Sequence, residues 1–371
     1  MEVAIYEIMI PKVAIIYLSY HPEPYIEKVT TALGKMTYPK DKVELVVVDN
    51  PHPEFGSAKE FLAEKVMPLS GNVLPRVTLI ANEKNLGFAG GNNIGIKWAI
   101  ENSFDYVFLL NNDAFPAPGF LEPLVEAMAA DKKIGAAQSL LMLAANPTLV
   151  NSAGNVMHYL GFGYCWGYKK TPAELNLSPV KEIGYASGAC LLMRADLLKQ
   201  YGGLDEDFFL YHEDLEYSYR LKSLGYKIVL ARDSMVYHQY EFSRSVSKYF
   251  WMERNRYAVI LMFYKLPTLI LLLPTKLIVE IGLILMSIKG GWFTERLAVY
   301  RYWANLANWP LWLKKRRIIQ SRRTVSDKTL LKEVVSEILF QDDSIKNPLL
   351  VYVGNPLMSL YWTIVKKLIS W

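Results

Sequence analysis

The sequence is poor in the residues that build disulfide scaffolds and structural metal sites. Among its 371 residues there are 2 cysteines and 5 histidines. Cys165 and Cys190 have no metal-ligand spacing to one another or to the histidines. This scarcity excludes a disulfide-stapled domain and a structural zinc site, and it favours a reducing compartment.

The sequence also lacks a secretory signal pattern and an uninterrupted long apolar run. Near the N-terminus, Glu2 and Glu7 fall within a short apolar run that has no basic segment before it and no cleavage pattern after it. We therefore expect no secretory signal. Residues 257–288 are strongly apolar, but charged residues and prolines interrupt them. This pattern predicts an amphipathic hairpin in the plane of a membrane rather than a clean transmembrane helix.

The net charge of +5 conceals an uneven distribution along the chain. Residues 241–330 contain 16 Lys and Arg against 5 Asp and Glu, residues 331–371 are balanced, and residues 1–240 are net acidic. An acidic first part and a basic, aromatic second part predict two regions with different tasks. We expect the domains to be residues 1–240 and residues 241–371.

Short Val, Ile and Leu runs alternate with helical patterns in the first 110 residues. This alternation predicts an α/β fold, in which a parallel sheet is covered by helices on both faces and ligands bind beyond the carboxyl ends of the strands. We expect strands at Val13–Leu18, Val43–Val48, Val77–Ile80 and Tyr106–Leu110, and later at residues 186–193 and 227–230, with a helix over residues 213–224.

Residues 85–95 (NLGFAGGNNIG) place four glycines between an expected strand and an expected helix. Glycine permits positive φ and close backbone approach, and the N–H groups at a helix start can receive an anion. We expect the helix to begin near Asn92. The alternative is a tight turn that binds nothing, and the spacing does not match the dinucleotide-binding fingerprint.

Three further segments carry polar residues suited to chemistry. Asn111, Asn112 and Asp113 end an expected buried strand and offer the oxygen ligands that Mg²⁺ and Mn²⁺ prefer, although an ordinary turn uses the same residue types. Glu213 and Asp214 open a helix, where either can be a general base or can simply complement the helix dipole. His238 ends a strand-like run and is a metal ligand only if a carboxylate lies nearby.

Taken in order, these segments resemble the family 2 inverting glycosyltransferases of the GT-A fold, in their rhamnosyltransferase-like branch. The resemblance covers about residues 12–240. Arg254-Asn255-Arg256 and residues 322–327 resemble the C-terminal region of that branch. The matching segments are VVVDN at 46–50, NLGFAGGNN at 85–93, LLNND at 109–113 and GLDEDFFLYHED at 203–214.

The resemblance implies a fold and a set of residue roles. The fold would be a Rossmann-like GT-A domain for nucleotide-diphospho-sugars, followed by a mostly α-helical C-terminal region. Asp113 and His238 would hold a divalent metal, Mg²⁺ or Mn²⁺, although the first acid of the family's Asp-x-Asp motif is Asn111 here. Asp214 would be the catalytic base, with Glu213 as its competitor. The nucleotide-sugar would be bound by Ser19, Asp49, Asn50, Asn85, Asn92, Asn111 and Asn112.

The same resemblance implies a reaction with inversion at the anomeric carbon in a single displacement. The first expected donor is dTDP-L-rhamnose, and UDP-sugars are the alternative. The acceptor would be a hydroxyl of a lipid-linked glycan, in the synthesis of a cell-surface polysaccharide or glycoconjugate. Two rival interpretations stay open. One is a nucleotidyltransferase, which would carry a Gly-rich loop after the first strand, and the other is an inactive membrane-bound scaffold.

The second region interleaves basic and aromatic residues with aliphatic stretches at residues 270–273 and 277–286. Trp, Tyr, Lys and Arg beside aliphatic stretches are typical of a membrane interface. A single-stranded RNA groove requires far less aliphatic surface, so we expect no nucleic-acid partner. The alternative is a helical bundle that packs on the catalytic domain or forms a homo-oligomer. We expect a cytoplasmic protein, peripheral on the inner face of the cell membrane.

Overall fold

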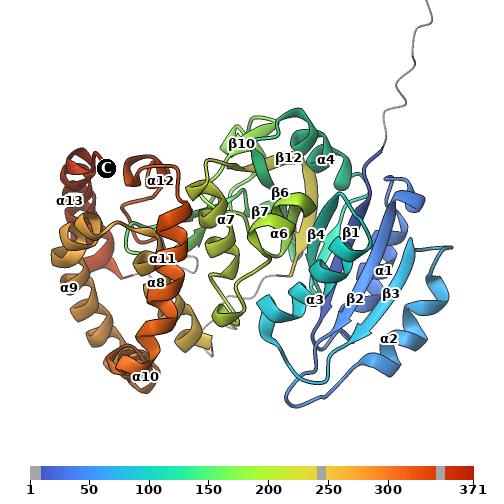
Figure 1. Ribbon diagram of the computed structural model, residues 1–371, viewed down its shortest axis with the longest axis horizontal. Helices are drawn as coiled ribbons and strands as arrows, with labels where there is room; N and C mark the ends of the chain where they lie inside the picture. The colour runs from blue at the N-terminus through green and yellow to red at the C-terminus, as the bar shows by residue number, and fades with distance from the viewer. Residues whose placement is uncertain (1–9, 240–247, 340–346) are drawn as a thin grey trace, which may run out of the picture.

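A ten-stranded mixed sheet forms the centre of the first part of the chain (Figure 1). The structure is a computed structural model and describes residues 10–239, 248–339 and 347–371. The strand order is β10-β12-β6-β11-β4-β1-β2-β3, with β5 on β12 and β7 on β6. The strands of this sheet are β1 (Val13–Ser19), β2 (Val43–Asp49), β3 (Arg76–Ala81), β4 (Tyr106–Asn111), β5 (Ala114–Pro116), β6 (Ile134–Leu143), β7 (Asn146–Ser152), β10 (Val180–Glu182), β11 (Cys190–Arg194) and β12 (Lys227–His238).

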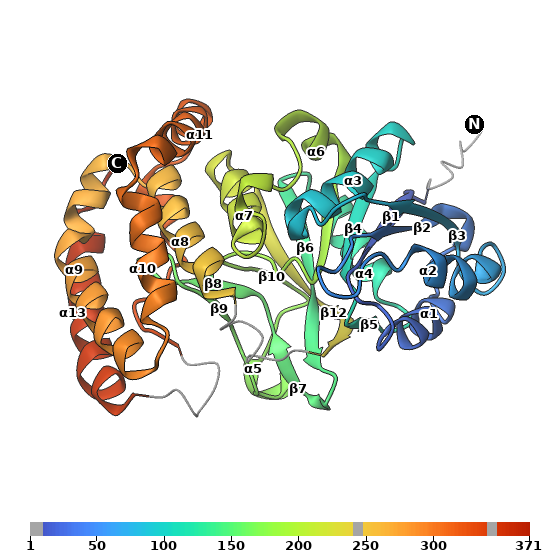
Figure 2. The same cartoon turned by 90° about the horizontal axis from the view of Figure 1, so that it is seen from below.

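Helices cover both faces of this sheet, because alternate side chains of its buried strands point to opposite sides. Ile15 of β1 belongs to one core cluster and Ile16 to another. Helices α1, α2 and α4 contribute to the first cluster, and α3, α6 and α7 to the second (Figure 2). Their bounds are α1 (Ile26–Gly34), α2 (Lys59–Lys65), α3 (Gly87–Glu101), α4 (Leu121–Ala130), α6 (Ala195–Tyr201) and α7 (Glu213–Ser223).

The predicted α/β architecture is confirmed, and two strands differ from their expected bounds. Strands β1, β2 and β3 run parallel to one another, as does β4 beside β1. The strand expected over residues 186–193 begins only at Cys190, and the one expected over 227–230 continues to His238. The extension follows from pairing: β12 shifts register on β6 after Ala231, and it then gains β5 as a second partner.

The glycine-rich segment lies inside a helix, so the expected turn before Asn92 is wrong. Helix α3 begins at Gly87 and packs on β1. A Cβ atom added at Gly91 would lie 2.5 Å from Leu18, and one at Gly95 would lie 2.5 Å from Ile16. These two glycines therefore permit the close approach of the helix to the strand rather than a change of chain direction.

The C-terminal part of the chain is a helical bundle packed against the α7 side of the sheet domain (Figures 1 and 2). Its core cluster also includes sheet-domain residues such as Phe208 and Leu215, and Trp312 in this cluster is fully buried. The expected domain boundary at residues 240 and 241 lies outside the described residues. The main helices of the bundle are α8 (Tyr249–Phe263), α9 (Leu266–Lys289), α10 (Phe293–Ala304), α11 (Trp309–Arg322) and α13 (Asn355–Leu368), with the short α12 (Asp327–Leu330) between the last two.

The expected amphipathic hairpin over residues 257–288 does not form as such. Its first part belongs to α8, which is buried in the bundle core from Glu253 to Phe263 apart from Leu261. The rest is α9, one continuous helix of 24 residues despite Pro274. By length and composition α9 is apolar enough to cross a membrane, and 11% of its most apolar window is buried. Whether α9 crosses a membrane does not follow from its length and composition, so the expectation that it does not stays a prediction.

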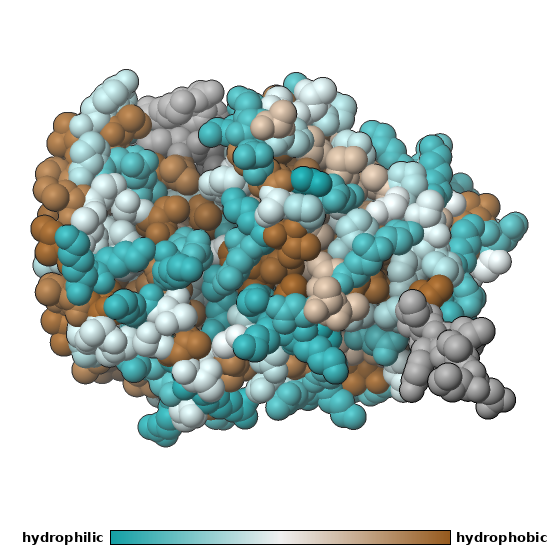
Figure 3. All heavy atoms as spheres, turned by 90° about the horizontal axis from the view of Figure 1, so that it is seen from above, coloured by the Kyte–Doolittle hydropathy of each residue, from teal (hydrophilic) through white to brown (hydrophobic). Residues whose placement is uncertain are grey.

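Aliphatic side chains gather on the outer surface of the bundle. Figure 3 shows them at the left end of the molecule, where Figures 1 and 2 place α9 and α13. The exposed side chains of α9 follow the helical repeat, and Ile278, Ile281 and Leu285 are each 60–69% exposed. Helix α13 adds a parallel row at Leu357, Leu360, Ile364 and Leu368.

Candidate active site

The carboxyl ends of β1 and β2 bring two predicted nucleotide-binding residues together. Ser19 pairs with Asp49 in the strand register, and both are buried. The Ser19 hydroxyl has no hydrogen-bond partner among the residues that the structure describes. Asp49 accepts hydrogen bonds from the Ser57 hydroxyl at 2.5 Å and from the Ala58 N–H at 3.2 Å. Since a buried polar group without a partner is costly, Ser19 is the better placed of the two to bind a ligand.

Asn50 is the centre of an amide cluster at the same edge of the sheet. Its Nδ2 donates to Asn85 Oδ1 at 3.0 Å, and its Oδ1 accepts from the Leu86 N–H at 2.9 Å. Asn85 Oδ1 also accepts from the Gly87 N–H at 2.8 Å. Burial raises the pKa of the neighbouring Tyr20, and a hydrogen bond with Asn85 opposes that rise. Asn50 and Asn85 are thus brought together, and they hold the chain that leads into α3.

The first N–H groups of α3 are engaged by the protein itself. Those of Leu86 and Gly87 donate to the two asparagine side chains just described. Those of Phe88 and Ala89 donate to the carbonyl of Phe209, at 2.7 and 3.3 Å. An anion binds a helix start through N–H groups that lack such partners. The prediction that this helix start receives an anion is therefore wrong.

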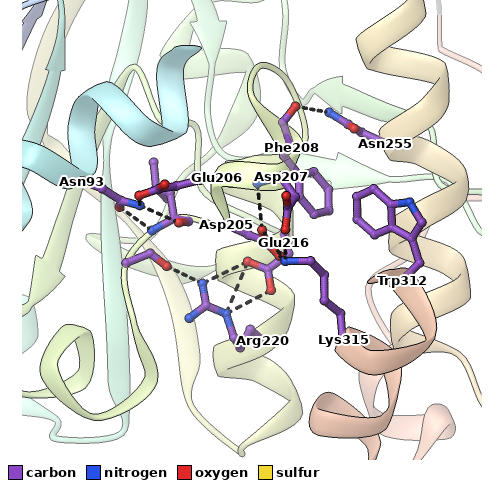
Figure 4. Close-up of polar contacts among 12 residues, drawn as sticks. Asn93, Asp205, Glu206, Asp207, Phe208, Glu216, Arg220, Asn255, Trp312 and Lys315 are labelled. Carbon is purple, nitrogen blue, oxygen red and sulfur yellow. Dashed lines mark hydrogen bonds and ion pairs between the residues drawn. The ribbon is translucent and has the colours of Figure 1, made fainter. Parts of the chain in front are cut away.

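Two neighbouring asparagines of α3 have different surroundings. Asn92 is buried, and its Nδ2 donates to the Phe88 carbonyl one turn earlier, at 2.9 Å. Asn93, to which the sequence assigned no role, exchanges two hydrogen bonds with the backbone of Leu204 and donates to Glu206 (Figure 4). Asn93 therefore ties α3 to the acidic segment before α7, while the predicted ligand role of Asn92 stays a prediction.

The residues at the end of β4 are joined to β1 and to the chain before β11. The Asn112 side chain donates to the Tyr20 carbonyl at 2.7 Å. The Asn111 N–H donates to the Ala189 carbonyl at 3.0 Å. These contacts hold the Asn-Asn-Asp segment at the carboxyl edge of the sheet, where ligands bind in such folds.

Asp113 and His238 meet, although 125 positions separate them in the sequence. The pairing of β5 with β12 places Ala114 opposite His238, and Asp113 Oδ1 lies 3.3 Å from His238 Nε2. The other ring nitrogen, Nδ1, lies 3.0 Å from Asn151 Oδ1. With Nδ1 donating to that oxygen, Nε2 is the acceptor nitrogen and faces the carboxylate. Asn151 was not predicted, because nothing local in the sequence places β7 against His238.

This pair fits two ligands of a divalent metal. Both side chains are mostly buried, with 15% of Asp113 and 10% of His238 exposed. A carboxylate oxygen and an imidazole acceptor nitrogen that face each other favour a cation between them. Within residues 10–239, 248–339 and 347–371, no group of three or more His, Cys, Asp or Glu side chains has a metal-binding arrangement. A metal here would complete its coordination with other ligands, such as water or a bound substrate.

Asp214 opens α7 and is oriented by two backbone N–H groups. Its Oδ2 accepts from Gly188 at 3.0 Å and its Oδ1 from Leu215 at 2.7 Å. Burial raises the pKa of Asp214, and these hydrogen bonds oppose the rise. Burial also raises the pKa of Glu213 well above its usual value, and the charge of Asp214 adds to that effect. Asp214 is therefore the readier of the two to ionise and accept a proton.

Asp214 lies at the same edge as the predicted metal pair. Its carboxylate accepts a hydrogen bond from the Gly188 N–H, and the carbonyl of the next residue, Ala189, accepts one from the Asn111 N–H of β4. A single loop before β11 thus connects the predicted base to the Asn-Asn-Asp segment. The sequence had marked Ser187 and Gly188 as part of a strand, whereas they form the loop whose N–H group orients Asp214.

Comparison with known sequences identifies the family. The model of the family described as "Glycosyltransferase like family 2" matches residues 11–258. The chain belongs to this family. The match extends past the sheet domain into α8 of the helical bundle, and it confirms the resemblance found in the sequence motifs. The protein is a family 2 glycosyltransferase with a GT-A fold and a helical C-terminal region.

Three relatives of this glycosyltransferase show how far the similarity extends. The "N-acetylglucosaminyl-diphospho-decaprenol L-rhamnosyltransferase" of Mycobacterium tuberculosis is 24% identical over 243 residues, 60% of this chain and 75% of the relative. "Probable glycosyltransferase YdaM" of Bacillus subtilis is 23% identical over 67% of this chain and 55% of its own length. The crystal structure of GalNAc-T7, solved with UDP, GalNAc and Mn²⁺, has a TM-score of 0.50 and 17% identity over 62% of this chain and 44% of that chain. At this identity the structural likeness shows the fold.

Proposed function

We propose that this protein transfers L-rhamnose from dTDP-L-rhamnose, with inversion and with a divalent metal, to a hydroxyl of a lipid-linked glycan. A UDP-sugar is the second candidate for the donor. The observation that carries the proposal is the meeting of Asp113 and His238, at 3.3 Å, on the sheet edge that also holds Asp214. An inactive scaffold would not need the Asp113 and His238 pair and the Asp214 carboxylate at one edge of the sheet.

Asp113 and His238 would hold the metal, and the two phosphates of the donor would complete its ligands. When bound, Mg²⁺ or Mn²⁺ would neutralise negative charge on the departing nucleoside diphosphate. The protein offers no substitute at α3, because the N–H groups at that helix start already have partners. Ser19 is suited to bind the nucleoside with its unpartnered buried hydroxyl. We keep Asp49, Asn50, Asn85, Asn92, Asn111 and Asn112 as proposed nucleotide-sugar residues.

Asp214 would accept the proton of the acceptor hydroxyl while that oxygen attacks the anomeric carbon. The Gly188 and Leu215 N–H groups orient its carboxylate. Its raised pKa makes the carboxylate a better proton acceptor than an exposed aspartate, once it is ionised. Attack from the face opposite the leaving diphosphate inverts the configuration in one step. Burial and the charge of Asp214 raise the pKa of Glu213 well above its usual value, so Glu213 ionises less readily and is the weaker candidate.

The donor and acceptor follow from the mycobacterial relative, whose name describes rhamnose transfer to a sugar carried on a polyprenyl diphosphate. The aliphatic surface of the helical bundle supports an acceptor of this kind. Lys265 and Lys289 flank α9, and Lys366 and Lys367 lie in the last turn of α13. Cations at the ends of exposed aliphatic helices suit a membrane with anionic headgroups.

We propose that α9 lies in the membrane interface and does not cross the bilayer. Glu280, in the middle of α9, hydrogen-bonds Tyr257 and Tyr300 and pairs with Arg256, so one side of the helix is held by α8 and α10. Carrying α9 through a bilayer would take these charges into the hydrocarbon. The anionic cytoplasmic leaflet would then place the enzyme on the inner face of the cell membrane.

The donor is tested by thermal unfolding of the purified chain with dTDP, UDP, GDP or CDP, each with and without Mn²⁺. A ligand at about 100 times its Kd stabilises the protein by about 2.7 kcal/mol. A metal-dependent rise of Tm with dTDP, followed by release of dTDP from dTDP-L-rhamnose when a polyprenyl-diphosphate-linked sugar is present, supports the proposal. A rise with UDP alone removes the donor and keeps the mechanism. No response to any nucleotide by the folded protein overturns the proposal.

A further inference from the structure

Helix α8 of the helical bundle reaches the segment that leads into the catalytic helix α7. Asn255 of α8 is fully buried, and its Nδ2 lies at hydrogen-bond distance from three backbone carbonyls of this segment. The acceptors are the carbonyls of Phe208 at 2.9 Å, Leu210 at 3.0 Å and Tyr211 at 2.7 Å. Figure 4 shows the contact with Phe208. An amide group has two N–H donors, so the three carbonyls share them.

The segment held by Asn255 has an unusual backbone. Phe209, Tyr211 and His212 all have positive φ, at 62°, 67° and 68°, and none of them is glycine. Such conformations cost free energy and persist only where surrounding contacts hold them. Glu213 and Asp214 follow immediately, so this backbone determines how α7 presents the predicted base.

Contacts on both sides of Asn255 lock it in place. Its Oδ1 accepts from Arg254 Nε at 2.9 Å, and Arg254 itself donates to the Phe208 carbonyl at 3.2 Å. The Arg254 guanidinium lies over the Trp251 ring, 4.5 Å from its centroid, and the same ring stacks on Phe209. The Phe209 carbonyl in turn caps the start of α3. One segment therefore joins α8, α3 and α7.

We infer that Asn255 is a positioning residue for the transfer reaction. It acts through the 208–212 backbone, which it holds in the conformation that sets the carboxylate of Asp214 against Gly188. The helical bundle is thus a working part of the active site as well as a membrane-facing region. The inference rests on the proposed function, because it assigns the positioned group to that reaction.

The chain offers a matched control for this role. Gln320 of α11 uses its amide in the same way, donating from Nε2 to the carbonyls of Met262 at 2.9 Å and Phe263 at 3.0 Å. Those carbonyls belong to the end of α8 and not to the 208–212 segment that leads into α7. In both Asn255→Asp and Gln320→Glu, a carboxylate of the same size replaces an amide that donates hydrogen bonds to backbone carbonyls. Asn255→Asp keeps an acceptor for Arg254.

The test compares Asn255→Asp, Asn255→Ala and Gln320→Glu in the full chain. We expect the two Asn255 variants to lose 10-fold or more in kcat for transfer, with the Kd for the donor nucleotide changed less than 3-fold. Gln320→Glu should keep kcat within 3-fold at a comparable loss of Tm. Hydrogen exchange should show faster exchange for the amides of Phe88, Ala89 and Glu216 in the Asn255 variants only. If Asn255→Asp does not fold, Asn255→Ala still tests the role of Asn255.

Two results would overturn the inference. One is an Asn255 variant whose kcat falls no more than that of Gln320→Glu. The other is unchanged exchange at Phe88, Ala89 and Glu216 despite the substitution. The exchange experiment needs no substrate, so it separates this inference from the proposed function. A wild-type chain that transfers no sugar would overturn the proposed function, and protection lost at those amides would still show that Asn255 holds the segment.

Discussion

The two regions of this glycosyltransferase distribute polar and apolar groups in opposite ways. In the sheet domain, aliphatic strands are buried and the acids of the site lie at an edge. In the helical bundle, Arg256 and Arg296 are fully buried with Glu253, while Ile278 and Ile281 lie on the outer surface. Such an outward aliphatic face is uncommon on a monomer in water. This difference supports the proposed membrane-facing role of the bundle, for which an oligomer interface is the alternative.

The charged side chains buried in the bundle form ion pairs, and these pairs offset the free-energy cost of burying the charges. Arg296 donates to Glu253 at 2.8 Å and also pairs with Glu280, and Arg256 pairs with both acids. Burial alone would raise the pKa of Glu253, but the two arginines hold it at about 2. These contacts connect α8, α9 and α10, so the helix with the exposed aliphatic face is joined to the helix that carries Asn255.

The substitution with the largest expected effect lies in the sheet domain. Asp214→Asn removes the proton acceptor and should lower kcat for transfer by about 10²–10⁴-fold. The donor Kd and vesicle binding should stay within 3-fold of the wild type, because neither depends on this carboxylate. Steady-state kinetics and titration with dTDP and Mn²⁺ check both. Turnover that survives in Asp214→Asn and disappears in Glu213→Gln would move the role to Glu213.

The buried charges should dominate the stability of the bundle. Arg296→Met leaves Glu253 and Glu280 with one arginine between them, and breaking a buried ion pair from one side costs about 3–5 kcal/mol. Urea unfolding measures this change. Arg301→Met removes an exposed arginine from the same helix and should cost less than about 1 kcal/mol. Equal effects of the two substitutions would contradict the contrast between buried and exposed charge.

The outer face should govern membrane binding. Replacing Ile278, Ile281 and Leu285 by Ser removes three side chains that would each contribute about 1.5–3 kcal/mol when buried in lipid. Binding to phosphatidylglycerol vesicles should fall by at least about 100-fold in co-sedimentation, with nucleotide binding kept.

A matched triple variant controls for a general loss of surface hydrophobicity. Val73, Val180 and Met235 are exposed on the sheet domain, at 37–44%, and their replacement by Ser should leave vesicle binding unchanged. Sedimentation velocity tests the alternative, in which this face joins two copies of the chain. If the wild type is an oligomer that binds no vesicles, and if replacing Ile278, Ile281 and Leu285 by Ser makes it a monomer, the face is an oligomer interface.

The smallest expected effect concerns the pH dependence of stability in the sheet domain. Burial, followed by the charge of Asp214, raises the pKa of Glu213 above its value in the unfolded chain. The folded state therefore binds more protons, and stability falls as the pH rises from the unfolded pKa toward the folded one. Glu213→Gln removes this loss. Its Tm should exceed that of the wild type at pH 8 by more than it does at pH 5, and a uniform shift would contradict the assignment.

Much of the fold could be predicted, because each buried strand appears in the sequence as a short aliphatic run. Strands β1, β2, β3 and β4 lie within a residue or two of their expected bounds. The start of α3 was misplaced, because glycine has two uses that look alike in sequence. Gly91 and Gly95 serve close packing, whereas Gly87 has a φ of 72° beside the Phe209 carbonyl.

The site was predictable in its residue types and not in its contacts. Asp113, His238 and Asp214 follow from motifs, and the structure brings all three to one edge. Asn151 and Asn255 could not be given roles, since each acts on a residue more than 40 positions away. Asn255 had one signal, its place in the Arg-Asn-Arg segment, but no local pattern says which backbone it holds.

Three properties of this protein can be inferred from the amino-acid sequence alone: the alternation of strands and helices, the order of the polar motifs, and the basic, aromatic character of the second region. These properties are local, since each depends on spacing within one strand or helix. The folded chain was needed to show that the Phe209 carbonyl caps α3, that His238 faces Asp113, and that Glu280 of α9 pairs inside the bundle. Each of these depends on long-range packing, where the burial of one group is set by the element that covers it.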